Sequence, residues 1–304
     1  MAVNSAIKLS NLDGLIQEKI SDNYIFDKTA ETSVFQKLGE KVPLTNDGYG
    51  IPVFSGDLEP YWTSDTEKKG AKSASGQVKK INPETLAVMI PMSNKNLTVN
   101  DHGWYAQLQK KVIEAFASKF DQTVAHGSGP FGDNYLDKSA NVDWGVLPDA
   151  ENTKIPYYES LITAKALIQS TGTYDLNGFV FDISAETDFD NTTDAVNRPL
   201  FNDSIYGDVA NPLRQGRVIG RATYLKKKLS TVEQSIGYAG DWTQFAWGQV
   251  GNIRYETSDS ASVTINGQLV SAWENNLIVV RAETDFGILI NDINAFAKFT
   301  RPSE

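Results

Sequence analysis

Residues 101–124 read DHGWYAQLQKKVIEAFASKFDQTV, and this stretch decides the fold. Large apolar side chains recur there at every fourth position, at Trp104, Leu108, Val112, Phe116, Phe120 and Val124. Four residues turn a helix by about 40° more than one full turn, so these side chains form one stripe that winds slowly around it. Asn100 or Asp101 can cap such a helix at its start, and Gly127 can end it.

The predicted helix is long, and it is apolar over more than half of its circumference. At 1.5 Å per residue it would extend for roughly 35 Å, about twice the usual length in a globular protein. Its remaining narrow face carries Lys110, Lys111, Glu114 and Asp121. Other parts of the chain must therefore pack along it, and we call residues 101–126 the spine helix.

Composition and charge are those of an ordinary globular protein. The chain has 304 residues, 40% hydrophobic and 22% charged, which suits one large domain or two smaller ones. Because it contains no cysteine, disulfides and thiolate chemistry are excluded. A net charge of −10 argues against a dedicated nucleic-acid-binding protein. With neither a signal-peptide pattern nor a long apolar run, we expect synthesis in the cytoplasm and no membrane partner.

Helical and strand patterns mix along the chain without regular alternation, which predicts an α+β fold. Helices are expected at residues 33–38, 157–170 and 184–196. Strands are expected at residues 49–54, 86–92, 178–183, 218–219, 239–250 with breaks at Gly240 and Gly248, 253–257, 262–265, 277–281, 287–289 and 295–300.

A polar stretch, residues 55–83, separates two of the predicted strands. It has almost no apolar side chain after Trp62. Its lysines are Lys68, Lys69, Lys72, Lys79 and Lys80. A polar excursion of about thirty residues cannot be buried within its own subunit. Two interpretations remain open: a disordered loop, or a long β-hairpin that projects onto another subunit.

Patterns typical of enzyme active sites are missing from the sequence. His102 and His126 lie at opposite ends of the spine helix, too far apart to share a metal ion, and we interpret both as helix-end residues. No phosphate-binding glycine loop and no Gly-x-Ser-x-Gly motif occurs. The acidic residues Asp182, Glu186, Asp188 and Asp190 fit a solvated helix face. We therefore expect no enzyme activity, no cofactor and no metal.

Short motifs follow one another along the chain in a specific order. They are PETLAV (83–88) followed by Ser93, FDQTVAHGSG (120–129), GFVF (178–181), RPLF (198–201) with residues 213–218, GDWTQF (240–245), and NLIVVRAE (276–283) followed by AF (295–296). In this order they resemble the tailed-bacteriophage major capsid proteins with the Hong Kong 97-type fold. Residues 215–217 depart from the family's usual Gly and Pro. The resemblance covers about residues 13–300.

The resemblance implies a domain organisation and a function. It implies an N-terminal arm (1–37), an extended β-hairpin loop (54–85), a peripheral domain with the spine helix (38–53, 86–147 and 253–285) and an axial domain (148–252 and 286–304). Such chains self-assemble into pentamers and hexamers of an icosahedral head shell around packaged double-stranded DNA. An acidic shell suits this role, because repulsion from phosphate leaves the DNA mobile.

Partners and location are also implied by the resemblance. We expect a virion capsid assembled in the host cytoplasm, a portal, a separate scaffolding protein and a possible decoration protein. Inter-subunit contacts of the loop would involve Lys68, Lys69 and Lys72. An encapsulin-like nanocompartment shell protein is the alternative within the same fold. A sugar-binding or adhesion module is the alternative from another class, although the scatter of Trp62, Trp104, Trp144, Trp242, Trp247 and Trp273 favours core positions.

Some members of this family join subunits by an isopeptide bond between a loop lysine and a neighbour's asparagine, assisted by a glutamate. The matching residues here are Lys69, next to Lys68, with Asn276 and Glu283. An apolar strand around Glu283 would raise its pKa, so that it could take a proton from the lysine. The alternative is structural: Asn276 and Glu283 connect strands by hydrogen bonds and form no covalent bond.

Overall fold

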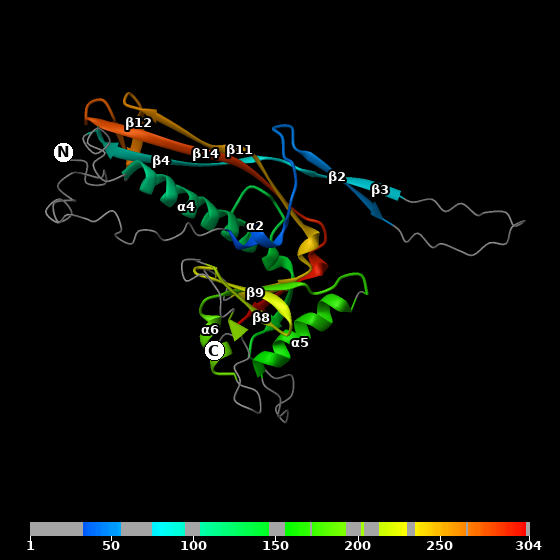
Figure 1. Ribbon diagram of the computed structural model, residues 1–304. Coiled ribbons are helices and arrows are strands. Elements are labelled where there is room, and N and C mark those ends of the chain that lie inside the picture. Colours follow the sequence, from blue (N-terminus) through cyan, green and yellow to red (C-terminus); the bar gives the residue numbers. More distant parts are fainter. Residues whose placement is uncertain are drawn as a thin grey trace, which may run out of the picture.

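The computed structural model describes residues 33–55, 75–94, 104–145, 156–170, 172–192, 202–203, 213–229, 235–265 and 267–301. Within these ranges the chain is a mixed α+β structure, so the predicted class is confirmed. It has two main sheets, one of four strands and one of seven. Figure 1 shows them in two separate layers of the molecule, with a two-stranded hairpin that extends away from both.

The four-stranded sheet carries the spine helix on one face. Its strands are, in order, β1 (Glu40–Lys41), β11 (Phe245–Ser258), β14 (Leu277–Ile290) and β4 (Glu84–Ser93). Helix α4 (Trp104–His126) lies along this sheet (Figure 1). Val112 and Phe116 of α4 pack with Ala282 of β14, and apolar side chains of β4 and β11 complete this core. The apolar stripe of the sequence is thus the face that the sheet covers.

The predicted spine helix is confirmed over Trp104–His126, while its predicted caps, Asn100 and Asp101, lie outside the described residues. The helix ends at Gly127, which has a φ of 67° and whose N–H donates to the carbonyl of Thr123 at 2.9 Å. Glycine adopts this left-handed conformation without steric cost, so it closes the helix.

Strands β11 and β14 are longer than the sequence predicted. We expected β14 as two strands and β11 as one strand broken at Gly248 with a separate strand at residues 253–257, but each runs through 14 residues. The register between β11 and β14 does shift between Val250 and Arg254. Gly248 and Gly287 lie where side chains from other parts of the chain approach the strand backbone closely. A Cβ on Gly248 would lie 2.7 Å from Leu44, and one on Gly287 would lie 2.4 Å from Ile81. The break near Gly240 is real, because the short turn Trp242–Gln244 separates β10 (Ser235–Gly240) from β11.

The opposite face of the four-stranded sheet is covered at one end by a small hairpin, β12 (Ser262–Ile265) and β13 (Gln268–Ser271). Val263 and Ala272 pack with Leu277 and Val279 of β14. Successive side chains of a strand point to opposite faces, so Val279 and Ala282 face opposite ways. The remainder of this outer face carries the charged side chains described below.

The seven-stranded sheet forms the second body with the two helices α5 (Pro156–Gln169) and α6 (Ala185–Asp190). Its strands are, in order, β5 (Ala140–Asp143), β15 (Phe296–Thr300), β10, β6 (Gly178–Asp182), β9 (Arg221–Lys226), β8 (Arg214–Val218) and β7 (Asn202–Asp203). Its core is aromatic. The ring of Trp144 lies 5.0 Å from Phe181, 5.5 Å from Phe189 and 5.3 Å from Phe299.

Two elements of this body differ from the prediction. Helix α6 was expected over residues 184–196 but spans Ala185–Asp190, and residues 193–196 lie outside the described residues. The strand expected at residues 218–219 begins earlier, as β8, and ends at Val218, since Ile219 and Gly220 have φ values of 51° and 73°. Two successive residues with positive φ make the tight turn that joins β8 to β9.

The predicted β-hairpin is confirmed in its two arms, β2 (Tyr49–Ser55) and β3 (Ser75–Ile81). They pair antiparallel from Tyr49 opposite Ile81 to Ser55 opposite Ser75. The predicted inter-subunit lysines Lys68, Lys69 and Lys72 lie outside the described residues. At its root the hairpin is fixed, because Ile81 is buried with Leu44 and Leu289.

The short helix α2 (Val34–Leu38) connects the start of the described chain to both bodies, and the prediction at residues 33–38 is confirmed. The Ser33 hydroxyl caps it by accepting a hydrogen bond from the Gln36 N–H at 3.1 Å. The ring of Phe35 packs against Tyr238, Trp242 and Phe245. The core around Phe35 therefore joins the end of the spine helix to both sheets.

Candidate functional site

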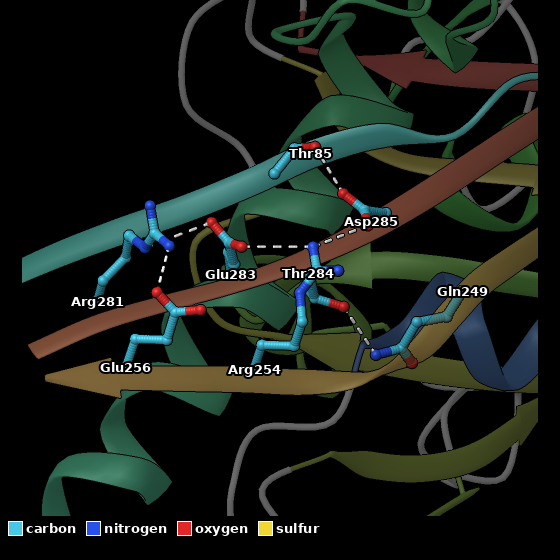
Figure 2. Close-up of polar contacts among 8 residues, drawn as sticks. All are labelled: Thr85, Gln249, Arg254, Glu256, Arg281, Glu283, Thr284 and Asp285. Atoms are coloured by element: carbon cyan, nitrogen blue, oxygen red, sulfur yellow. Dashed lines mark hydrogen bonds and ion pairs between the residues drawn. The ribbon is translucent and has the colours of Figure 1, made fainter. Parts of the chain in front are cut away.

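A row of charged side chains lies on the outer face of the four-stranded sheet, away from α4. Arg281, Glu283 and Asp285 alternate along β14 with inward-facing Ala282 and Thr284, which are buried. On β11, Arg254 is paired with Glu283 and Glu256 with Arg281. We call Arg254, Glu256, Arg281, Glu283 and Asp285 the charged face; Figure 2 shows how these side chains contact one another across the strands.

Each charged side chain of this face contacts a side chain of the opposite charge. One nitrogen of Arg254 lies 3.4 Å from Glu283 and 3.2 Å from Asp285. Arg281 pairs with Glu256, and its Nε lies 3.6 Å from Glu283. Asp285 also accepts a hydrogen bond of 2.5 Å from the Thr85 hydroxyl of β4. The face therefore connects all three long strands of the sheet.

The predicted apolar environment of Glu283 is wrong. Its carboxylate lies between two guanidinium groups, and 19% of its side chain is exposed. The apolar run of residues 277–280 lies farther along β14, where the β12–β13 hairpin covers Leu277 and Val279. Arg281 lies on the same face of β14, two positions before Glu283, and is visible in the sequence, whereas the pattern along this strand did not reveal Arg254 on the adjacent strand β11.

Asn276 lies at the opposite end of this arrangement. It has a φ of 52°, its carbonyl accepts from the Asn94 N–H at 3.1 Å, and its side-chain oxygen lies 3.4 Å from the Asn94 amide nitrogen. At about 3.3 Å per residue, the seven positions between Asn276 and Glu283 span roughly 23 Å. One chain therefore does not bring these two residues together, and Lys69 lies outside the described residues.

A buried ionic contact links the spine helix to the seven-stranded sheet. Asp121 of α4 pairs with Lys226 of β9, and both side chains are only 2% exposed. Asp121 also accepts hydrogen bonds from the Ser33 hydroxyl and from the Val34 N–H, the latter at 3.2 Å. Burial raises the pKa of the Asp121 carboxyl, and Lys226 opposes that shift. The sequence placed Asp121 on the narrow face of the helix that carries the charged residues; its partner 105 residues away explains why it is buried.

His126 forms a second link between these parts of the molecule. Its Nδ1 lies 2.6 Å from the Asp137 carboxylate and its Nε2 lies 2.8 Å from the Leu229 carbonyl. Asp137 also accepts from the hydroxyls of Tyr238, at 2.7 Å, and Ser235, at 2.9 Å. Burial alone would raise the pKa of Asp137, but these hydrogen bonds hold it below its usual value. His126 is a helix-end residue as predicted, and only 9% of its side chain is exposed. His102 lies outside the described residues.

The interpretation of the acidic cluster as a solvated face is wrong. Asp182 is buried and accepts from the Leu229 N–H at 2.8 Å, while Asp188 accepts from the Trp144 ring N–H at 2.9 Å. Glu186 pairs with Arg214, and only Asp190 is exposed. These carboxylates fix loops and ends of strands. Within the described ranges no group of three or more His, Cys, Asp or Glu could hold a metal ion.

The tryptophans follow the core prediction with one exception. Trp144, Trp242 and Trp247 are buried, whereas Trp273 is 75% exposed. Trp62 and the side chain of Trp104 lie outside the described residues. Over the described part of the chain, no helix is long and apolar enough to cross a membrane.

The curated proteins to which this chain is similar in sequence include major capsid proteins of phages. The chain is 27% identical over 292 residues to the probable major capsid protein gp17 of Mycobacterium phage D29, which covers 94% of this chain and 90% of that protein. It is 21% identical over 287 residues to the major capsid protein of Staphylococcus phage 80alpha, covering 90% of this chain and 81% of that protein.

Solved structures share the fold across almost the whole chain. One from Gordonia phage Cozz has a TM-score of 0.69 at 18% identity, covering 100% of this chain and 98% of that chain. The capsid of an empty GTA particle has a TM-score of 0.65 at 15% identity, covering 99% and 100%. The model of the Phage capsid family matches residues 13–300, so this chain belongs to the phage capsid family.

Proposed function

We propose that this chain is the major capsid protein of a tailed phage and self-assembles into the pentamers and hexamers of an icosahedral head shell that encloses double-stranded DNA. Membership in the phage capsid family carries the capsid function. Its curated relatives are phage major capsid proteins, so the encapsulin-like alternative is not favoured. The structural observation that supports self-assembly is the projecting β2–β3 hairpin.

This hairpin needs a surface that its own subunit does not supply. Among the described residues neither β2 nor β3 pairs with a third strand, so each has an unpaired edge. Val78 on β3 is 71% exposed. An isolated two-stranded hairpin is only marginally stable in water, and an unpaired edge readily associates with another chain. These features support a role as the extended loop (54–85), laid over an adjacent subunit.

The root of the hairpin supports the same role by fixing where it points. Lys79 donates to the carbonyl of Asn291 at the end of β14, and Ile81 occupies the space that Gly287 leaves open. Both contacts hold β3 against the four-stranded sheet, so the free end extends outward (Figure 1). Lys68, Lys69 and Lys72 in the tip would then meet acidic groups of the neighbour, through contacts that are individually weak.

The finer domain assignment is part of this proposal. The spine helix with most of the four-stranded sheet corresponds to the peripheral domain (38–53, 86–147 and 253–285), and most of the seven-stranded sheet to the axial domain (148–252 and 286–304). Three segments cross these bounds: residues 140–143 of β5 belong to the seven-stranded sheet, and residues 245–252 of β11 and 286–290 of β14 belong to the four-stranded sheet. Residues 1–37 would form the N-terminal arm. A portal, a separate scaffolding protein and a possible decoration protein are the further partners we propose, with packaged DNA held inside by no specific contacts because the chain is acidic.

For Asn276 and Glu283 the contacts favour the structural role over cross-linking. Asn276 connects β14 to the end of β4, and Glu283 connects β14 to β11. A cross-link with Lys69 would need side chains from different subunits. Denaturing gels of mature particles test this directly. A single band at 33.5 kDa agrees with the structural role, whereas a ladder that disappears in Lys69→Ala establishes the bond.

Removal of the hairpin tip tests the proposed function. Residues 56–74 are replaced by Asn-Gly, a pair that closes a hairpin at the register of Ser55 opposite Ser75. We expect a folded subunit, with unchanged near-ultraviolet circular dichroism, that forms no stable shells in electron micrographs. As a control, Lys227 and Lys228, both exposed, are changed to Gln and shells still form. Shells of normal size from the shortened chain would contradict the proposal.

A further inference from the structure

We propose that Trp273 and Leu269 form a contact between two copies of this chain at the far end of the four-stranded sheet. The inference rests on the proposed shell assembly and names one of its contacts. Trp273 is 75% and Leu269 76% exposed, more than any other large apolar side chain of the described residues. Only four positions separate them, so at most about 14 Å of chain lies between their Cα atoms.

Both side chains point away from a core that their neighbours fill. Leu269 lies on β13 next to Val270, which packs against the outer face of the sheet, and Trp273 follows Ala272, which is fully buried there. The inward positions of this hairpin are therefore occupied. The two large apolar side chains that point outward remain in contact with water. Burial of their apolar surface against a partner would be favourable.

The turn that carries Trp273 is held in place on both sides. The Ala272 N–H donates to the Ala261 carbonyl at 2.8 Å, and the Leu277 N–H donates to the Ala272 carbonyl at 2.9 Å. The Asn275 side chain donates to the Ser271 carbonyl at 2.9 Å. Trp273 is thus displayed on an ordered turn, and little conformational entropy is lost when a partner covers it.

The size of the patch identifies the partner as another copy. The exposed parts of two such side chains amount to on the order of 300 Å². A stable complex between two free proteins needs about 800 Å² on each side, so this patch cannot hold a separate partner alone. In a closed shell each copy is held by several contacts at once, and a small tryptophan-centred contact then adds to the others.

The position in the molecule agrees with this partner. Figure 1 places the β12–β13 hairpin at one extremity of the four-stranded sheet, whereas the β2–β3 hairpin extends from the other. Contacts at both extremities are what a subunit needs to join a continuous layer of copies. The β2–β3 hairpin supplies one of them, and Trp273 with Leu269 supply the other.

Tryptophan emission tests the contact in free subunits and in assembled shells. The difference between wild-type and Trp273→Phe spectra isolates Trp273, and acrylamide serves as a neutral quencher. We expect quenching of this signal to fall at least fivefold on assembly. The matched control is Trp144→Phe, whose signal is protected in both states because Trp144 is 3% exposed. Equal quenching of Trp273 in shells and in free subunits would overturn the proposal, and would also be the result if a decoration protein were the natural partner.

A double variant gives a second test. Leu269→Ser with Trp273→Ser should leave the thermal midpoint of the free subunit unchanged, since both side chains are exposed, and raise the concentration needed for assembly at least tenfold. Leu167→Ser, at a 40% exposed position of α5, should assemble like the wild type. Normal assembly of the double variant overturns the contact. Wild-type protein that forms no shells even when the scaffolding protein is supplied contradicts the proposed function itself, and with it the proposed contact.

Discussion

Charged side chains are used in two different ways in this molecule. On the charged face, five ionic groups lie in a row across neighbouring strands, and Arg254 and Glu256 are more than half exposed. At the junction of the spine helix with the seven-stranded sheet, the Asp121–Lys226 pair is almost completely buried. Both arrangements satisfy their charges, but water screens only the first.

The difference between the exposed and the buried ion pairs indicates which part of the subunit is rigid. An exposed ion pair contributes little stability and can exchange partners, whereas breaking a buried pair leaves a charge without solvent. Asp121 and His126 lie on the last turns of the spine helix. Their partners are Lys226, the last residue of β9, and Leu229, three residues further along the chain. The buried contacts therefore fix the helix relative to the second sheet, while the charged face leaves the outer surface free to meet a neighbour.

The largest effect is expected at the buried pair. Lys226→Met should destabilise the subunit by about 3–5 kcal/mol, because Asp121 is left buried without its cation. The double variant Asp121→Asn, Lys226→Met removes both charges, keeps a side-chain oxygen that can accept from the Ser33 hydroxyl or the Val34 N–H, and should recover most of that loss. Urea denaturation measures both. A loss below about 1 kcal/mol in the single variant would show that the junction does not depend on this pair.

A smaller and pH-dependent effect is expected at Asp137. Its pKa in the folded state is lowered, so it contributes stability above the unfolded value of about 3.9, and that contribution is lost as pH falls through the folded value. Asp137→Asn should lower stability at pH 7 by about 1–3 kcal/mol and flatten the decline towards acid. Unfolding curves between pH 7 and pH 3 test this. If stability declined equally with pH in the variant and the wild type, Asp137 would not be the source of this pH dependence.

The smallest effect is expected on the charged face. Glu283→Gln should change subunit stability by less than about 1 kcal/mol, because its two arginine partners are largely solvated. Raising the salt concentration should shrink the difference further. Thermal unfolding at low and high ionic strength measures this. A loss of several kcal/mol at Glu283 would mean that the two regions do not differ as described.

Local sequence signals predicted the features that depend on neighbours along the chain. The four-residue stripe predicted the spine helix, Gly127 predicted its end, and the polar stretch between strands predicted the hairpin arms. Ser33 likewise precedes the helix that it caps. In each case the physical cause lies within a few residues of the element, so the pattern could be read from the sequence.

Features that depend on distant partners were not predicted. We expected Gly248 to break a strand and Gly287 to begin one, yet both lie within long strands and make room for Leu44 and Ile81. The sequence does not show that Asp121 is buried, because its partner Lys226 is distant along the chain. It likewise suggests apolar surroundings for Glu283, because Arg254 lies on the neighbouring strand β11. Trp273 was assigned to the core because the six tryptophans are scattered along the chain, and no local pattern marks it as exposed.

Hydrogen exchange of the β2–β3 hairpin tests the central claim most directly, namely that this hairpin is completed by a neighbouring subunit. Amide exchange is followed for β2 and β3 in free subunits and in shells, with β14 as the internal reference because it is paired on both sides. We predict that exchange of the hairpin amides slows at least tenfold on assembly while that of β14 is unchanged. Hairpin amides that exchange as fast in shells as in free subunits would contradict the account.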